Sequence, residues 1–367
     1  MTDTTSTART SAGRTSTGRH VVRLLALVIG LALLFAPFLF PGVRALEVAA
    51  RICVFVVLVA SYDLLIGYTG IVSFAHTMFF GLGAYGTAIG LRRIGEGWDG
   101  LILGGAAGVA VALVLAILVG LLSLRVRAIF FAMVTLAVAS VMLVLASQLS
   151  GLTGGEDGIT YSVPDIFSPA TALLHDAHGK TLRLMGVRMT GKITAYYFVF
   201  AGSLALFLVL LRVTVSPLGT VLKAIRENEG RAEALGYRVV TYRTFVFGFS
   251  AVIAALAGVL YATWLKYTGP DTTLGFDIMV DILLMVVIGG MGTMWGAVIG
   301  AALMVLAQYY LRDLMEAGAA AVANVPLLPD MLNPDRWLLW LGVVFILLVY
   351  FFPAGIAGTL MSREVSK

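Results

Sequence analysis

"LEVAARICVFVVLVASYDLLI", residues 46 to 66, is a nearly unbroken apolar run. A helix needs roughly 20 such residues to cross a hydrocarbon core of about 30 Å. Comparable runs recur along the chain, which is 60% hydrophobic and only 12% charged. This composition lies well outside the range of soluble globular domains. Because the apolar runs are long and continuous, they favour helices over the short alternating strands of a β-barrel. The sequence therefore predicts an all-α integral membrane protein.

The apolar runs predict about ten transmembrane helices, some of them short or broken at glycines. Because this number is even, both termini lie on one side, and the arginines before the first run place that side in the cytoplasm. The first run could be a signal peptide, but its length and the lack of a clear cleavage site favour a retained anchor. The predicted spans are residues 21 to 40, 46 to 66, 71 to 90, 101 to 123, 128 to 149, 194 to 212, 244 to 264, 278 to 290, 294 to 311 and 337 to 353.

The domain organisation follows from these spans. Residues 1 to 20 are rich in Ser and Thr and are expected to be a disordered cytoplasmic tail. Residues 21 to 353 form the polytopic transmembrane domain, and residues 354 to 367 a cytoplasmic C-terminal tail. Two longer connections interrupt the domain: an extracytoplasmic segment at 150 to 192 and a cytoplasmic loop at 213 to 243, which we call the central loop.

The central loop contains "AIRENEGRAEALGY", residues 224 to 237, the densest charge cluster of the chain. Ser216 and Pro217 predict a helix start, and Gly236 predicts its end. Gly230 lies inside and disfavours helix, so we expect either one helix or two short ones that meet near residues 228 to 230. An apolar stripe runs along one face. The loop is either a solvated amphipathic linker or a helix presented to a cytoplasmic partner. The stripe consists of Val221, Ile225, Ala232 and Leu235.

Two apolar stretches are interrupted by glycines. The first follows Leu65 and reads "IGYTGIVSFAHTMFFGLGAYG"; the second reads "IGGMGTMWGAVIG" and begins at Ile288. Glycine permits tight turns and close helix approach, so these breaks indicate either close packing or the border of a substrate path. The candidates for such a path are Gly67, Tyr68, Gly70, Ser73, His76, Gly289, Gly290 and Gly292.

Several polar side chains fall within or beside the apolar runs. Asp63 would cost about 2.5 to 3.5 kcal/mol at a helix centre and should therefore face protein or water. His76 has no metal-ligand companions in the sequence, which favours a hydrogen-bonded structural histidine over a metal ligand. Asp277 and Asp281 share one helical face; they suit a catalytic or cation-binding pair or, more simply, the acidic start of an exposed helix.

A search for catalytic motifs finds none. "HGKT", residues 178 to 181, ends like a phosphate-binding loop, but Leu174 stands where that motif needs glycine, and no strand precedes it. His-Glu-x-x-His and Gly-x-Ser-x-Gly do not occur. We therefore expect this chain not to be an enzyme, with no catalytic residue, no metal site and no cofactor of its own.

The sequence resembles the membrane permease subunits of bacterial ATP-binding-cassette importers for branched-chain amino acids. The matching motifs cover most of the chain from about residue 60 to 311 in the order of the family, with "FFPAGIAG" near the end. The N-terminal tail and residues 312 to 336 match nothing in it. The motifs are "DLLIGYTGIVSFAH" with "FFGLGAYG", "FFAMVTLA" with "LTGGEDGI", "SPLGTVLKAIRENEGRAEALGY" with "FVFGFSAVIAALAGVLYA", and "LLMVVIGGMGTMWGAVIGAAL".

The resemblance implies a multi-pass subunit of the bacterial cytoplasmic (inner) membrane that forms half of a translocation pathway. Its partners would be membrane lipid, a second homologous permease, two cytoplasmic ATPase subunits that bind ATP and Mg, and an extracytoplasmic substrate-binding protein, with no nucleic acid. In the family the central loop docks on the ATPase. The positions that match this role are Ile225, Glu227, Asn228, Glu229, Ala232, Leu235 and Gly236; those on the outer side are Thr153, Gly154, Gly155 and Asp157.

The resemblance leaves the substrate open. Members of the family carry branched-chain amino acids, and relatives carry other amino acids, urea or short amides. We expect branched-chain or related amino acids here. An ion-coupled secondary transporter is an alternative of another class, and it would need an intramembrane acid such as Asp63 to bind the coupling ion.

Overall fold

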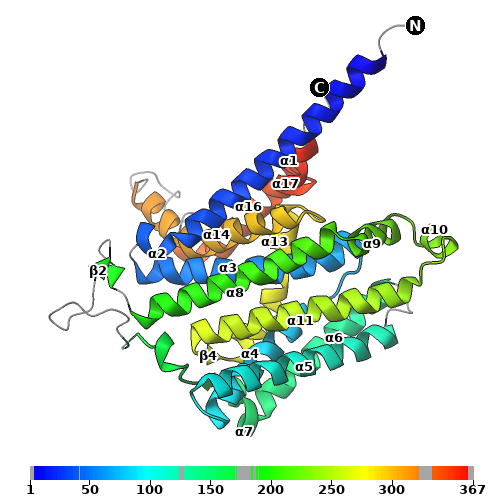
Figure 1. Ribbon diagram of the computed structural model, residues 1–367. Helices are drawn as coiled ribbons and strands as arrows, with labels where there is room; N and C mark the ends of the chain where they lie inside the picture. Colours follow the sequence, from blue (N-terminus) through cyan, green and yellow to red (C-terminus); the bar gives the residue numbers. More distant parts are fainter. Residues whose placement is uncertain are drawn as a thin grey trace. The chain divides into compact units, whose positions relative to one another are not determined.

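A computed structural model describes residues 4–40, 42–123, 128–169, 171, 183–184, 187–188, 190–321 and 333–362. These residues are mostly helical, and short strand pairs join β1 to β4 and β2 to β3 (Figure 1). The elements are α1 (Thr4–Leu34), α2 (Ala36–Leu39), α3 (Val43–Thr69), α4 (His76–Arg93), α5 (Trp98–Ser123), α6 (Ala128–Gln148), α7 (Ser150–Thr153), η1 (Gly155–Asp157), β1 (Ile159–Thr160), η2 (Asp165–Phe167), β2 (Arg183–Leu184), β3 (Val187–Arg188), α8 (Gly191–Val215), α9 (Pro217–Glu227), α10 (Glu229–Ala234), α11 (Val239–Leu265), β4 (Tyr267–Thr268), α12 (Pro270–Thr273), α13 (Phe276–Gly289), α14 (Met294–Ala321), η3 (Pro334–Arg336), α16 (Trp337–Phe351) and α17 (Gly355–Ser362).

Among the described residues, eight helical segments are long and apolar enough to cross a membrane. The chain is thus an all-α, multi-pass membrane protein. The predicted spans at residues 21 to 40 and 71 to 90 are not among the eight. The second of these corresponds to α4, whose glycines and terminal Arg92 and Arg93 lower its hydropathy. The count of ten spans and the side on which the termini lie stay predictions.

The chain divides into two units, and the larger one comprises residues 32 to 282. At its centre α11 packs against α3, α4, α5 and α8. Glycine lets these helices approach closely: a Cβ on Gly258 of α11 would lie 1.9 Å from the carbonyl oxygen of Phe80 in α4. Gly86 and Gly90 of α4 likewise lie against Gly104 of α5. Backbone contact of this kind needs small residues at the crossing point.

The smaller unit comprises residues 1 to 31 and 283 to 367. Val22 of α1, Ile299 of α14 and Ala357 of α17 form its buried cluster. Both predicted tails contain helix here: α1 begins at Thr4, and residues 355 to 362 form α17. Residues 363 to 367 lie outside the described residues. The disorder of the first tail and the cytoplasmic side of both stay predictions.

Candidate functional site

The central loop folds as two short helices, α9 and α10, between α8 and α11 (Figure 1). Pro217 is the first residue of α9, as predicted, but Ser216 donates its hydroxyl hydrogen bond back to α8 instead of capping α9. Asn228 separates the two helices, and its side-chain oxygen accepts a hydrogen bond from the Arg231 amide at 2.9 Å. Gly236 follows with a φ of 90°, a conformation that favours glycine. Of the two alternatives that the sequence leaves open, the structure has two short helices that meet at Asn228.

The apolar stripe of the central loop does not face outward as a whole. Ile225 and Ala232 are only 1% and 2% exposed, because they pack with Val239 at the start of α11. Val221 lies partly buried beside them, whereas Leu235 is 71% exposed. The chain itself therefore covers Ile225 and Ala232, and their part in coupling stays a prediction. The predicted coupling residues that remain exposed are Glu227, Asn228, Glu229, Leu235 and Gly236.

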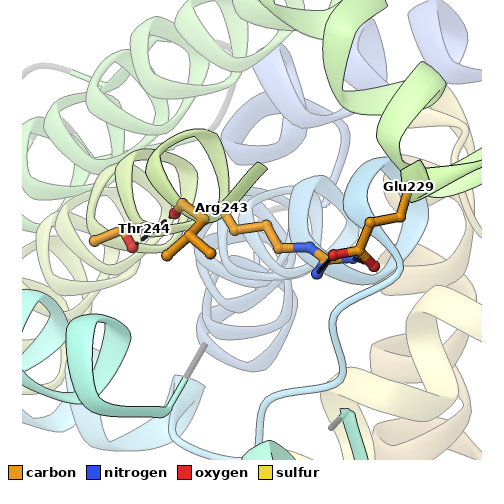
Figure 2. A network of polar contacts seen from close by, with 4 residues as sticks. Glu229, Arg243 and Thr244 are labelled. Carbon is orange, nitrogen blue, oxygen red and sulfur yellow. Dashed lines mark hydrogen bonds and ion pairs between the residues drawn. The ribbon is translucent and has the colours of Figure 1, made fainter. Parts of the chain in front are cut away.

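Glu229 forms a two-pronged ion pair with Arg243 of α11. The two guanidinium nitrogens donate to the two carboxylate oxygens at 2.8 and 3.0 Å. Figure 2 shows the two side chains pointing toward one another, with Thr244 beside them on α11. A planar guanidinium matches a carboxylate in this arrangement, which adds directional specificity to the charge attraction. The pair ties the start of α10 to the first turns of α11.

Two cations of α9 contact the end of α3. The Arg226 guanidinium donates to the carbonyl of Gly67, and the Lys223 ammonium lies 5.0 Å from the centre of the Tyr68 ring. The last carbonyls of a helix lack partners within the helix, and its macrodipole favours positive charge at this end. These contacts therefore hold α9 on the C-terminus of α3, directly before Gly70.

The first glycine break lies at the same place. Gly70 has a φ of 73° and ends α3, residues 70 to 75 are non-helical, and α4 begins at His76. His76 contacts Ser61, eight residues before the end of α3, or about 12 Å along the helix axis. Residues 70 to 75 therefore return into the interior. The Phe74 amide of this segment donates to Thr135 of α6 at 3.0 Å. Non-helical backbone at membrane depth is tolerated only where protein or a water-filled cavity surrounds it.

A buried polar junction connects three helices at this depth. The Ser61 oxygen lies 2.7 Å from Nε2 of His76, and the Ser61 hydroxyl donates to the Leu58 carbonyl at 2.8 Å. With that proton directed to Leu58, Nε2 donates to Ser61. The Ser250 hydroxyl of α11 donates to the Ser61 carbonyl at 2.6 Å. His76 is thus hydrogen-bonded, and Ser73 beside it is fully buried.

The second glycine break belongs to the smaller unit. Gly290 and Gly292 have φ angles of 109° and 80° and turn the chain from α13 into α14. A Cβ on Gly289 would lie 2.2 Å from the carbonyl oxygen of Gly296, and one on Gly355 would lie 2.3 Å from the Cα of Gly290. These glycines are therefore needed for a tight turn and for close packing. A role in a substrate path stays a prediction.

The predicted outer-side motif forms a compact turn. Gly154, Gly155 and Gly158 all have φ angles between 67° and 77°, and β1, which follows them, pairs with β4. Thr153 is buried, and its hydroxyl donates to the Ala146 carbonyl at 2.6 Å. The glycines of this motif thus mainly set the backbone conformation of the turn. Its Asp157 side chain is exposed.

Tyr161 and Lys266 fasten this turn to the end of α11. The Tyr161 hydroxyl donates to the Ala262 carbonyl at 2.9 Å, and burial raises the pKa of this phenol, so that it keeps its proton. The Lys266 ammonium donates to the Phe167 carbonyl at 3.2 Å; burial, with Lys192 nearby, lowers its pKa.

An apolar groove of about 470 Å³ lies between α4, α5 and α6. Its walls are mainly aliphatic, and the polar members are Tyr85, Arg93 and Thr153. The Arg93 guanidinium already donates to the Gly151 carbonyl at 3.1 Å. The groove suits an apolar occupant better than the charged ends of an amino acid.

The remaining acidic candidates do not assemble into a site. Asp63 is buried in α3, whereas Asp277 is exposed and Asp281 is half-buried on α13. Within the part of the chain that the structure describes, no three His, Cys, Asp or Glu residues come together as a metal site would require.

Four side chains that position the central loop and the polar junction are missing from the sequence-based candidates. They are Ser61, Arg226, Arg243 and Ser250, and none stands out by periodicity or motif. The available signal is local: Arg226 belongs to the charge cluster, and Arg243 follows it closely along the chain. The partners of Arg226 and Ser250 lie 159 and 189 residues away along the chain, so helical spacing could not reveal them.

Membrane transport proteins of the permease type typically combine glycine breaks beside spanning helices with non-helical backbone that returns into the protein interior. Here a folded loop is also bonded to two spanning helices. The family profile described as "branched-chain amino acid transport system / permease component" matches residues 44–353. The chain belongs to this family.

Individual relatives agree with the profile. The chain is 26% identical to the "High-affinity branched-chain amino acid transport system permease protein LivM" of Escherichia coli over 332 residues, 87% of this chain and 75% of that protein. The Salmonella typhimurium protein of the same name is 25% identical over 303 residues, 79% of this chain and 69% of the relative. A "Probable branched-chain amino acid transport permease protein LivM" of Methanocaldococcus jannaschii is 27% identical over 221 residues, 60% of this chain and 57% of the relative. No solved structure gives a significant match.

Proposed function

We propose that this chain is the permease subunit of an ATP-binding-cassette importer and forms half of the translocation pathway for branched-chain or related amino acids. The observation that carries the proposal is the central loop, which is charged, exposed at its tip and bonded to two spanning helices. A loop built in this way can receive motion from a soluble partner and pass it to the membrane domain. Membership of the permease family supports this role.

The assembly we propose contains a second homologous permease, two cytoplasmic ATPase subunits that bind ATP and Mg, and an extracytoplasmic substrate-binding protein. This chain has ten spans in the bacterial inner membrane, with both termini and the central loop in the cytoplasm. It binds no cofactor of its own, and the energy for transport comes from the ATPase subunits.

We further propose that the first glycine break borders the translocation path. Gly67, Tyr68 and Gly70 lie under α9, while Ser73 and His76 line the return of the chain into the interior. Movement of α9 would therefore reach this segment directly. Gly289, Gly290 and Gly292 are the corresponding candidates in the smaller unit.

The proposal is tested with the complete complex, purified from its native membrane through a tag on this chain and reconstituted into vesicles. We expect uptake of leucine, isoleucine or valine that requires enclosed ATP and the binding protein, and that persists when ionophores remove all ion gradients. Competition with urea and short amides measures the range of substrates.

An ion-coupled transporter is the alternative that the buried carboxyl of Asp63 favours. In that case uptake would follow the ion gradient without ATP and would be abolished by Asp63→Asn. That result would reject the importer.

A further inference from the structure

The central loop is attached to two different spanning helices, one through each of its short helices. Arg226, near the end of α9, bonds to α3, and Glu229, at the start of α10, bonds to α11. Only Asn228 lies between the two helices, and it has an extended backbone with φ of −158° and ψ of 99°. The loop therefore has two arms that meet at a single non-helical residue.

The arm to α3 uses charge at a helix end. Arg226 donates to the Gly67 carbonyl, while Lys223, one turn earlier on α9, covers the Tyr68 ring. Arg226 also passes close to Gly70: a Cβ there would lie 3.5 Å from the arginine Cγ. The contact is thus made at the residue where α3 ends and the non-helical segment begins.

The arm to α11 uses a paired hydrogen bond. Both guanidinium ends of Arg243 are bound to Glu229, and the Arg243 side chain is only 20% exposed (Figure 2). Beneath the pair, Ile225 and Ala232 pack on Val239. Glu229 is consequently held by its own chain, while its side chain stays 49% exposed.

The two helices at the ends of these arms meet in the buried polar junction. Ser250 of α11 donates to the Ser61 carbonyl of α3, and Ser61 contacts His76 at the start of α4. A displacement between α9 and α10 would therefore act on α3 and α11, which meet where α4 begins.

We infer that Arg226, Glu229 and Arg243 are positioning residues for coupling: they hold the central loop to α3 and α11 and transmit its motion, while the exposed tip around Leu235 meets the partner. This inference rests on the proposed function. It reassigns Glu229, which the resemblance places at the ATPase surface, to a role inside the chain.

The test compares charge reversal with charge exchange in the reconstituted complex. Glu229→Arg and Arg243→Glu should each leave assembly and ATP hydrolysis intact but lower the amino acid transported per ATP by about fivefold or more. The double variant, which restores an opposite pair, should recover the ratio to within about twofold of the unmodified complex. Glu233→Arg, an exposed reversal on the same short helix, should leave the ratio unchanged.

The arm to α3 is tested in the same vesicles. Arg226→Lys keeps a cation at the end of α3 and should retain most of the transport per ATP, whereas Arg226→Gln should lose it. Loss of ATPase binding by Glu229→Arg, with no recovery in the double variant, would overturn the inference by showing that Glu229 contacts the partner.

A second measurement separates this inference from the proposed function. In the isolated chain, the double variant Glu229→Ala/Arg243→Ala should lower the unfolding temperature by less than the sum of the two single variants. Either single substitution already removes the ion pair, so the second one loses less. Additive shifts would overturn the arm to α11 whatever the complex transports. Absence of ATP-driven uptake by the unmodified complex would instead reject the proposed function. The unfolding measurement would then still test the arm to α11.

Discussion

Helices α3 and α6 have similar compositions and opposite surroundings. Both are long and apolar, and α6 is the more hydrophobic of the two. Yet 89% of the most apolar part of α3 is buried in the chain, against 17% for α6. The buried helix is the one that carries Ser61 and Asp63, whereas α6 presents mainly aliphatic side chains outward. A helix enclosed by its own chain can carry an ionisable group such as Asp63, which would be costly on a helix that faces lipid, so Asp63 marks α3 as the inner helix.

The largest expected effect comes from a glycine at a crossing of the inner helices. Gly258→Leu should abolish folding or cost about 3 kcal/mol or more, because the new side chain would meet the Phe80 carbonyl of α4. Gly342→Leu on α16 is the matched control, since nothing lies within 4 Å of its added Cβ. Thermal unfolding of the purified chain in detergent measures both, and equal losses would remove the distinction between inner and outer helices.

Two valines, one on α3 and one on α6, allow the stability cost of the same substitution to be compared on a buried and on an exposed helix. Val57 is fully buried, so Val57→Ala should lower stability by about 2 kcal/mol through lost contacts and a cavity. Val141 is 56% exposed, and Val141→Ala should change stability little in detergent. The measurement is the free energy of unfolding of each variant. A loss of stability for Val141→Ala as large as that for Val57→Ala would mean that α6 is buried in the isolated chain.

A pair of serines gives the smallest effect. Ser250→Ala removes the hydrogen bond to the Ser61 carbonyl and should cost about 1 kcal/mol. Ser140 of α6 bonds only to the Leu136 carbonyl of its own helix, and Ser140→Ala should cost less. Thermal unfolding in detergent measures both variants. Ser250→Ala should lower the stability more than Ser140→Ala, and the reverse order would contradict this expectation.

The same contrast explains how much the sequence could predict. The helical class follows from composition alone, and the division of the central loop follows from Asn228 and Gly230, because turn and cap chemistry is local. Pro217 and Gly236 also lie where local rules place them.

The sequence does not predict which face of a helix is buried against other parts of the same chain. The spacing of Ile225, Ala232 and Leu235 predicts an apolar face but not what the face contacts, and the fold buries two of the three. The bond from Arg226 to Gly67 joins residues 159 positions apart, beyond any helical period. The sequence predicts Thr153 as an outer-side contact but does not show that its hydroxyl donates to the Ala146 carbonyl near the end of α6.

Cross-linking from single cysteines in the assembled complex determines directly which part of the central loop meets the ATPase. The one native cysteine, Cys53, is buried and can be replaced by alanine, after which a photoreactive maleimide is attached at Leu235→Cys or, as control, at Ile225→Cys. We expect illumination of membranes to join the Leu235 probe to an ATP-binding subunit, while the buried Ile225 position gives no product. Failure of the Leu235 probe to reach any ATPase, with the complex intact and transporting, would show that the tip of the central loop does not meet the ATPase.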